Sequence, residues 1–117
     1  MQLDSELLDY GIIRVNLSGR MDILGTQTID MKFHALTATQ NAPFLVDISD
    51  VSFLASIGMR TLLSSAKAVA MRGGAMVIYN PQPDVTDVLE VSGVADLIPI
   101  FHDFQEAMDA LINHQNK

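Results

Sequence analysis

The sequence predicts an α/β fold with a mostly parallel central sheet that follows an N-terminal hairpin. Two short runs, 44–48 and 75–79, are almost entirely apolar, which is typical of strands buried on both faces of a sheet. Segments with helical periodicity separate these runs, and such alternation favours parallel strands joined by crossover helices. With the opening hairpin, the predicted order is ββαβαβαβα.

The N-terminal hairpin is predicted from an alternating segment. Residues 2–9 are expected to form a first strand, and Tyr10-Gly11 a tight turn. Residues 12–17 alternate in polarity, which predicts a half-buried strand that pairs back on the first and ends at Ser18-Gly19. Its apolar face holds Ile13, Val15 and Leu17, and its polar face holds Arg14 and Asn16.

The middle of the chain alternates helices and strands. A helix is expected from Asp22 or Thr26, either of which can cap it, to about Ala38. A buried strand follows at 44–48, and residues 50–54 are expected to form a connection. The next elements are a helix at 56–71, ended by Gly73-Gly74, and a strand at 75–79.

The C-terminal part begins with a loop at 80–83. A helix is expected at 84–91, ended by Ser92-Gly93. Residues 97–101 are expected to form an edge strand, because Pro99 cannot donate a ladder hydrogen bond. Asp103 is expected to cap a last helix that runs to about Ile112.

Length and composition limit the classes of function. The 117 residues fit one domain, 1–117, and the 49% apolar content supports a proper core. The chain has no cysteine, which excludes disulfides, thiolate metal sites and a cysteine nucleophile. The net charge is −7 with only seven scattered Lys and Arg residues, so nucleic acid is excluded as the direct partner. An acidic surface is compatible with a basic protein partner.

The chain has no recognisable targeting or membrane segment. The start is acidic and lacks the apolar core of a signal peptide. No apolar stretch approaches the roughly 18 residues that a membrane span needs. We therefore expect a cytoplasmic protein that does not contact a membrane.

The most informative segment is 47–58, in which a buried strand ends, a polar turn follows, and Ser56 stands where the next helix begins. A serine there is either an ordinary helix cap or an exposed site for regulation. A helix N-terminus offers unpaired N–H groups and a positive dipole end, so it tolerates a phosphate. Met59 and Arg60 follow directly, and are either core and solvent residues or part of a protein-binding face.

Other chemistries find little support in the sequence. The neighbourhood of Ser56 lacks the first glycine of the G-x-S-x-G elbow, and no histidine has a spacing that recommends it as a base. The chain is therefore not expected to be an enzyme. Carboxylates at Asp47, Asp50, Asp84 and Asp87 fit no metal motif, so neither a metal nor another cofactor is expected.

Four stretches, in the right order, resemble the STAS domain of bacterial anti-sigma-factor antagonists. They match the family patterns L-x-G-x-[LM]-D, D-[LF]-x-x-[VL]-x-F-[LMI]-D-S-x-G, an R-G-G that leads into a strand, and [LF]-x-x-[ST]-G-[LV]. In this chain the stretches are Leu17–Asp22, Val46–Gly58, Arg72–Tyr79 and Val88–Val94. Together they extend over nearly the whole chain.

The resemblance implies a compact domain with helices mainly on one side of the sheet. It also implies partner switching by phosphorylation. The unphosphorylated antagonist binds an anti-sigma factor with a histidine-kinase-like ATPase fold, and the sigma factor is released. The anti-sigma factor is also a serine kinase that phosphorylates the antagonist and so ends the interaction. A PP2C-type phosphatase restores it.

Carried over by position, the phosphorylation site is Ser56, and Asp22 and Gly58 match conserved-pattern positions beside it. The implied partner-binding set is Asp22, Ala55, Ser56, Ile57, Gly58, Met59 and Arg60. Two positions depart from the family pattern, because Ala55 replaces an aspartate and Ile57 replaces Ser or Thr. Some STAS relatives are unphosphorylated signalling scaffolds or subunits of lipid-transport complexes, and Ala55 keeps this alternative open.

Overall fold

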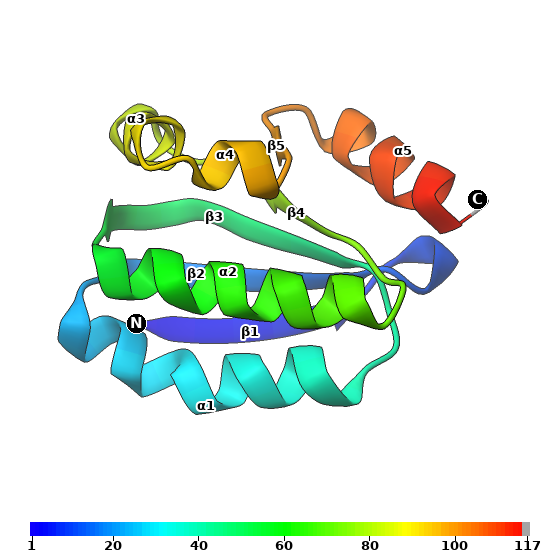
Figure 1. Ribbon diagram of the computed structural model, residues 1–117, viewed down its shortest axis with the longest axis horizontal. Helices are drawn as coiled ribbons and strands as arrows, with labels where there is room; N and C mark the ends of the chain where they lie inside the picture. Colours follow the sequence, from blue (N-terminus) through cyan, green and yellow to red (C-terminus); the bar gives the residue numbers. More distant parts are fainter. Residues whose placement is uncertain (116–117) are drawn as a thin grey trace.

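A five-stranded sheet with strand order β1-β2-β3-β4-β5 forms the centre of the computed structural model, which describes residues 1–115 (Figure 1). β1 pairs antiparallel with β2, and all later pairs are parallel. The strands are β1 (Gln2–Leu7), β2 (Ile13–Met21), β3 (Phe44–Leu54), β4 (Met76–Tyr79) and β5 (Ile100–Phe101). The helices are α1 (Ile23–Thr39), α2 (Ser56–Met71), α3 (Pro83–Val91), α4 (Val94–Leu97) and α5 (Phe104–Gln115), with a 3-10 turn η1 (Asp9–Gly11).

The predicted class is confirmed, and the predicted elements occur in the predicted order with one helix, α4, added between α3 and β5. Two boundaries in the first half also differ. β2 continues past Ser18-Gly19 to Met21, and residues 50–54 belong to β3 instead of a connection. Each of two register shifts places one extra residue of β3 opposite β2, and Gly19 has a φ of +111° beside them. The bulges turn both Val51 and Leu54 toward the core, so this stretch lacks a period of two and does not resemble a strand in the sequence.

The predicted strand at 97–101 is wrong in its first part. A short helix, α4, ends at Leu97, and the Ile98 N–H donates to the Val94 carbonyl over 2.9 Å. Gly93 starts this turn with a φ of +86°. Only Ile100–Phe101 pairs with β4. Four residues are too few to produce a helical period, so the sequence offered no signal for α4.

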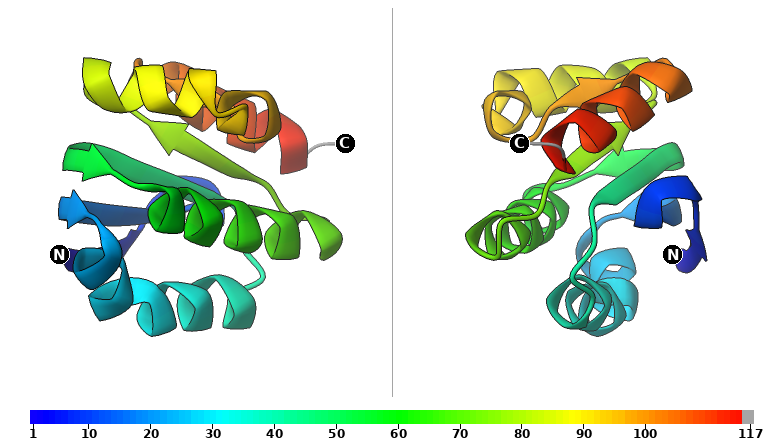
Figure 2. Two further views of the ribbon diagram at one scale, coloured as in Figure 1. Left: turned by 60° about the vertical axis from the view of Figure 1, so that its left-hand side comes forward. Right: turned by 90° about the vertical axis from the view of Figure 1, so that its right-hand side faces the viewer.

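The sheet has two unequally covered faces (Figure 2). One face carries the larger core, to which α1, α2, α3 and α4 contribute, whereas α5 packs on the other face. Helices mainly on one side, as expected, are therefore confirmed. Alternation along β3 assigns Val46 to the first core and Leu45 to the second. The predicted apolar face of β2 likewise lies in the larger core.

An ion pair joins β2 to β3 on the face of the sheet that α5 covers in part. Arg14 on β2 donates to the buried Asp47 on β3 over 2.5 Å, and the Ser49 hydroxyl and N–H also donate to Asp47. The Arg14 guanidinium lies 5.7 Å from the ring centroid of Tyr79 and 5.3 Å from that of Phe104. Burial raises the pKa of Asp47, but hydrogen bonds from Ser49 and Arg14 outweigh it and hold the pKa below the ordinary 3.8.

Gly58 determines how closely α2 approaches the ends of β2 and β3. A Cβ at this position would lie 2.8 Å from Leu54 Cδ1, 2.8 Å from Met21 Cγ and 3.2 Å from the Met21 carbonyl oxygen. The first turn of α2 therefore rests directly on the last residue of each strand. A side chain here forces the side chains of Leu54 and Met21, or the helix start itself, to shift.

We expect Gly58→Ala to lower the free energy of unfolding by about 1–3 kcal/mol, although alanine is the better helix former. Urea denaturation measures this change. Ser64→Ala, at an exposed position of the same helix, is the control and is expected to stay within about 0.5 kcal/mol of wild type. Equal stability of the two variants would show that the contact at Gly58 is loose.

Asp47 makes the free energy of unfolding depend on pH in the acidic range. Because its folded pKa lies below the unfolded value, its contribution is fully present above about pH 4 and is lost as pH falls through the folded pKa. We expect Asp47→Asn to cost about 1.5–3 kcal/mol at neutral pH and to flatten this acid-dependent loss. Denaturation at several pH values tests it, with Asp4→Asn on exposed β1 as the control. A wild-type acid profile in Asp47→Asn would contradict the assignment.

Candidate functional site

Ser56 is the first residue of α2 and is exposed at the end of β3. The helix N-cap is Ala55, which has extended φ and ψ of −93° and 171° and makes no side-chain cap hydrogen bond. The interpretation of Ser56 as an ordinary helix cap is therefore wrong. Its hydroxyl is instead available at the surface of the helix start.

The start of α2 is attached to the sheet through main-chain hydrogen bonds. The Ala55 N–H donates to the Met21 carbonyl over 3.0 Å, and the Met59 N–H donates to the Ala55 carbonyl over 3.1 Å. The earlier N–H groups of the first turn have no i−4 carbonyl to bond, and the positive end of the helix dipole lies there. The first turn of α2 contains no acidic residue. An anionic group on Ser56 would thus meet a favourable local field.

Asp22 lies at the neighbouring helix start and caps α1. Its Oδ1 accepts from the Gly25 N–H over 2.8 Å, and its Oδ2 lies 3.5 Å from Arg20 Nε. The Gly25 hydrogen bond, helped by Arg20, lowers the pKa of Asp22. Because Asp22 directly follows Met21, its carboxylate stands at the same end of the sheet as Ser56. Asp22, and not Thr26, is therefore the cap of this helix.

The structure brings the expected partner-binding residues together at the carboxyl ends of β2 and β3, but their exposure differs. Ser56 and Arg60 are exposed, and Gly58 is buried, where it has a packing role. Half-buried positions are occupied by Ala55, Ile57 and Met59. Within the expected set, Ser56 and Arg60 are therefore the side chains open to solvent.

Three exposed apolar residues at this end were missed by the sequence analysis. Ile23 and Leu24, in the first turn of α1, are 62% and 75% exposed, and Phe53, three residues before Ser56, is 40% exposed. Arg20 stacks over Phe53 at 4.4 Å from the ring centroid. We call Ile23, Leu24 and Phe53 the apolar rim. Large exposed apolar groups are unusual outside interaction surfaces, but in a sequence these three look like core residues.

A hollow of 440 Å³ opens beside Ser56 between α2 and the turn into α4. It is lined by Ser56, Met59, Arg60, Leu63, Ser64, Lys67, Ser92 and Val94. The lining contains two cations and no carboxylate. It is a shallow surface that suits a protein segment better than an enclosed small molecule.

Among the hydrogen bonds of residues 1–115, none joins the Ser56 hydroxyl to a histidine or a carboxylate. His34 bonds to Ser65 at 3.0 Å and to Asp30 at 3.1 Å, and His114 bonds to the Gly73 carbonyl. Across residues 1–115, no three His, Cys, Asp or Glu side chains gather in a way that suits a metal ion. Within the same range, no helix has the length and apolarity required to cross a membrane.

Curated proteins similar to the chain carry related names. The chain is 26% identical over 113 residues to "Anti-sigma F factor antagonist" from Paenibacillus polymyxa, which covers 95% of this chain and 97% of that protein. It is 27% identical over 88 residues to "Anti-sigma-B factor antagonist" from Bacillus subtilis, which covers 75% of this chain and 80% of the relative.

Solved structures show the same fold. The unphosphorylated form of the anti-sigma factor antagonist SpoIIAA aligns with a TM-score of 0.77 at 19% identity, over 96% of this chain and 97% of that one. The phosphorylated form of SpoIIAA, a cell fate determinant of Bacillus, aligns with a TM-score of 0.67 at 21% identity, over 93% of this chain and 98% of that one.

A family model described as "STAS domain" matches residues 8–107. This range contains β2 to β5, all of α1 to α4, and both helix starts of the site. Since the match covers most of the chain, the protein belongs to the STAS domain family.

Proposed function

We propose that this protein is an anti-sigma-factor antagonist that acts by binding and not by catalysis. In its unphosphorylated form it binds an anti-sigma factor with a histidine-kinase-like ATPase fold, and this releases the sigma factor. The observation that carries the proposal is the exposed Ser56 at the first position of α2, at the same end of the sheet as the apolar rim and four residues before Arg60. The names of the curated relatives support the same role.

Phosphorylation of Ser56 switches the protein off in this proposal. The anti-sigma factor acts as the serine kinase, a PP2C-type phosphatase reverses the reaction, and the cycle takes place in the cytoplasm. A phosphate adds about −1.5 to −2 charges at neutral pH. The first turn of α2 stabilises that charge, so the fold survives. The effect lies at the interface, where the phosphate adds bulk between the apolar rim and the partner and repels its acidic groups.

An interaction module without a phosphorylation switch is the second candidate, as a signalling scaffold or a subunit of a lipid-transport complex. Ala55 and Ile57 favour it, because the acidic and hydroxyl side chains common at these two positions are absent. Retained partner binding with no phosphate on Ser56 identifies this candidate.

The kinase reaction is tested by incubating the protein with ATP and each histidine-kinase-like ATPase encoded in the same genome. We expect one of these ATPases to add a single phosphate at Ser56, located by peptide mass spectrometry, and Ser56→Ala to remain unmodified. Phosphate at another residue, or none with any ATPase, contradicts the switch.

Ser56→Asp separates binding from stability. We expect it to weaken binding to the partner ATPase at least tenfold, while the free energy of unfolding stays equal or rises by about 0.3–1 kcal/mol, because an acid in the first turn favours the helix. Calorimetric titration and urea denaturation measure the two effects. The matched control is Ser5→Asp on exposed β1, which is expected to leave binding unchanged. Equal binding by both variants rules out control at Ser56.

A further inference from the structure

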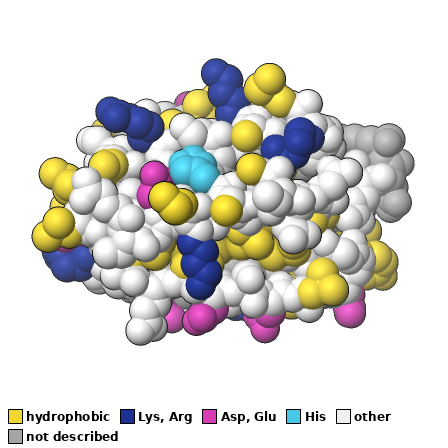
Figure 3. Space-filling view, turned by 90° about the horizontal axis from the view of Figure 1, so that it is seen from below, with side chains coloured by type: hydrophobic (Ala, Val, Ile, Leu, Met, Phe, Trp, Pro, Cys, Tyr) yellow, Lys and Arg dark blue, Asp and Glu magenta, His cyan; other side chains and the backbone are white. Residues whose placement is uncertain are grey.

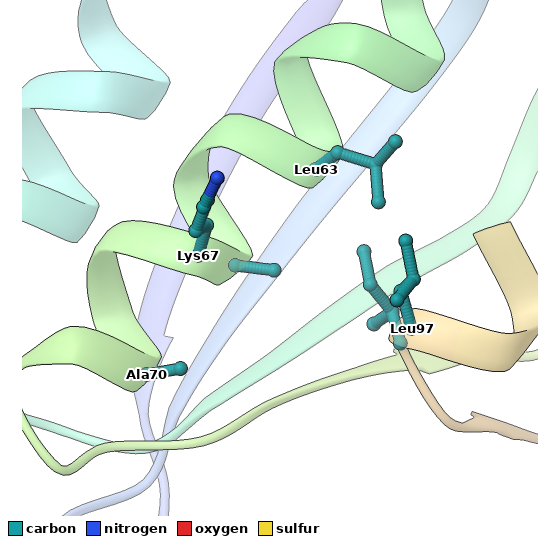
Figure 4. A pocket seen from close by; sticks show the side chains of 6 residues that line it. Leu63, Lys67, Ala70 and Leu97 are labelled. Atoms are coloured by element: carbon teal, nitrogen blue, oxygen red, sulfur yellow. The ribbon is translucent and has the colours of Figure 1, made fainter.

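A groove extends along α2 from the Ser56 hollow. A second hollow, of 410 Å³, adjoins the first and shares Leu63 and Lys67 with it. Leu63 on α2 and Leu97 on α4 point toward one another across it, and Ala70 lies farther along α2 (Figure 4). Leu97 is 71% exposed although it is a large apolar residue. From Ser56 to Ala70, fourteen helical steps give the groove a length of about 21 Å.

The charge along this groove is opposite to that of the protein. The chain has a net charge of −7, yet no acidic residue occurs between Asp50 and Asp84. Among residues 1–115, Arg60 and Lys67 are the only charged residues that line the two hollows. Within residues 1–115, neither of them has an ion-pair partner. Seen from the side on which α1 lies, Lys and Arg side chains spread over the surface, and Asp and Glu gather mostly along one edge (Figure 3).

From these observations we propose that the α2/α4 groove receives an acidic amphipathic helix of the partner protein. Apolar side chains of that helix fit between Leu63 and Leu97, and its Asp and Glu side chains pair with Arg60 and Lys67. A length of about 21 Å accommodates four turns of helix. Helix-in-groove recognition uses this arrangement of an apolar floor with flanking charges.

A protein helix fits the groove better than an anionic membrane. Lipid headgroups are attracted by clusters of about four to eight Lys and Arg side chains, whereas the groove offers two. Leu97 is the one strongly exposed large apolar side chain among its lining residues, and it faces across the groove toward Leu63. These groups are arranged to enclose an apolar side chain and not to enter a bilayer.

The inference rests on the proposed function, because the groove begins at Ser56 and continues the same interface. It adds a consequence for the switch. Arg60 is four residues after Ser56, so both side chains lie on one face of α2. A phosphate on Ser56 therefore competes with the acidic helix for Arg60, which couples phosphorylation to release along the groove.

The test is a selection, on the full-length protein, of helix-forming peptides of about 15 residues whose surface positions are randomised. We expect the enriched peptides to combine Asp and Glu with Leu or Ile at i, i+4 spacing. With the best peptide added to ¹⁵N-labelled protein, the largest amide shifts are expected at Leu63, Lys67 and Leu97. Enrichment of basic peptides, shifts on another surface, or no enrichment overturns the proposal.

Matched variants identify the contacts. We expect Lys67→Glu and Leu97→Asp each to weaken peptide binding at least tenfold. Lys32→Glu and Met31→Asp make the same types of change at exposed positions of α1 and are expected to leave binding within twofold. Circular dichroism confirms that all four variants fold. If the two α1 variants weaken peptide binding as much as the two groove variants do, the peptide does not bind specifically in the groove.

Two further measurements separate this inference from the proposed function. Vesicles of anionic phosphatidylglycerol are expected not to bind the protein. If they do bind, and Lys67→Glu abolishes that binding, a membrane is the occupant of the groove and the proposal is overturned. Lys67→Glu is also expected to weaken binding of the protein to the partner ATPase at least tenfold. If it does not, while Ser56→Asp does, the groove proposal fails and the phosphorylation switch stands.

Discussion

The close approach between the end of β2 and the first turn of α2 is the constraint on which the site depends. The Met21 carbonyl accepts from the Ala55 N–H, and Gly58 leaves no space between the helix and Met21. This contact fixes where α2 begins, and it also fixes the direction in which Ser56 faces. The same strand end continues into Asp22 and the first turn of α1. One main-chain junction therefore places the serine, the capped aspartate and the apolar rim at one end of the sheet.

The basic side chains on the two faces of the sheet differ in whether they have ion-pair partners, and this difference accounts for the positive charge beside the α2/α4 groove. On the α5 side, Arg14 donates to Asp47 and lies over the rings of Tyr79 and Phe104, so its interactions stabilise the fold. On the α2 side, Arg60 and Lys67 have no such partners within the described residues 1–115. A protein with fourteen acidic and seven basic residues that leaves these two cations unpaired beside an apolar groove has the charge pattern of a binding surface.

Sequence reasoning succeeded where a single period governs a segment. The alternation around Ile13, Val15 and Leu17 and the apolar runs of β3 and β4 predicted the sheet, because burial follows directly from side-chain direction. It failed at 50–54, since bulges break the period of two, and at α4, which is too short for a helical period. The sequence placed Ser56 at a helix start after a buried strand, and α2 does begin there; its role as a phosphorylation site stays a prediction. The rim was missed, because an apolar residue in a sequence does not reveal whether the fold exposes it.

Ala55, which stands where the resembling sequence pattern has an aspartate, has a physical consequence at the helix start. Ala55 is the N-cap of α2, and an aspartate at an N-cap accepts hydrogen bonds from the first-turn N–H groups. Asp22 does this for α1, where its carboxylate occupies the Gly25 N–H. With alanine at the corresponding position of α2, those N–H groups and the dipole remain available to a group carried by Ser56. The first turn of α2 therefore lacks the capping carboxylate that Asp22 supplies to α1.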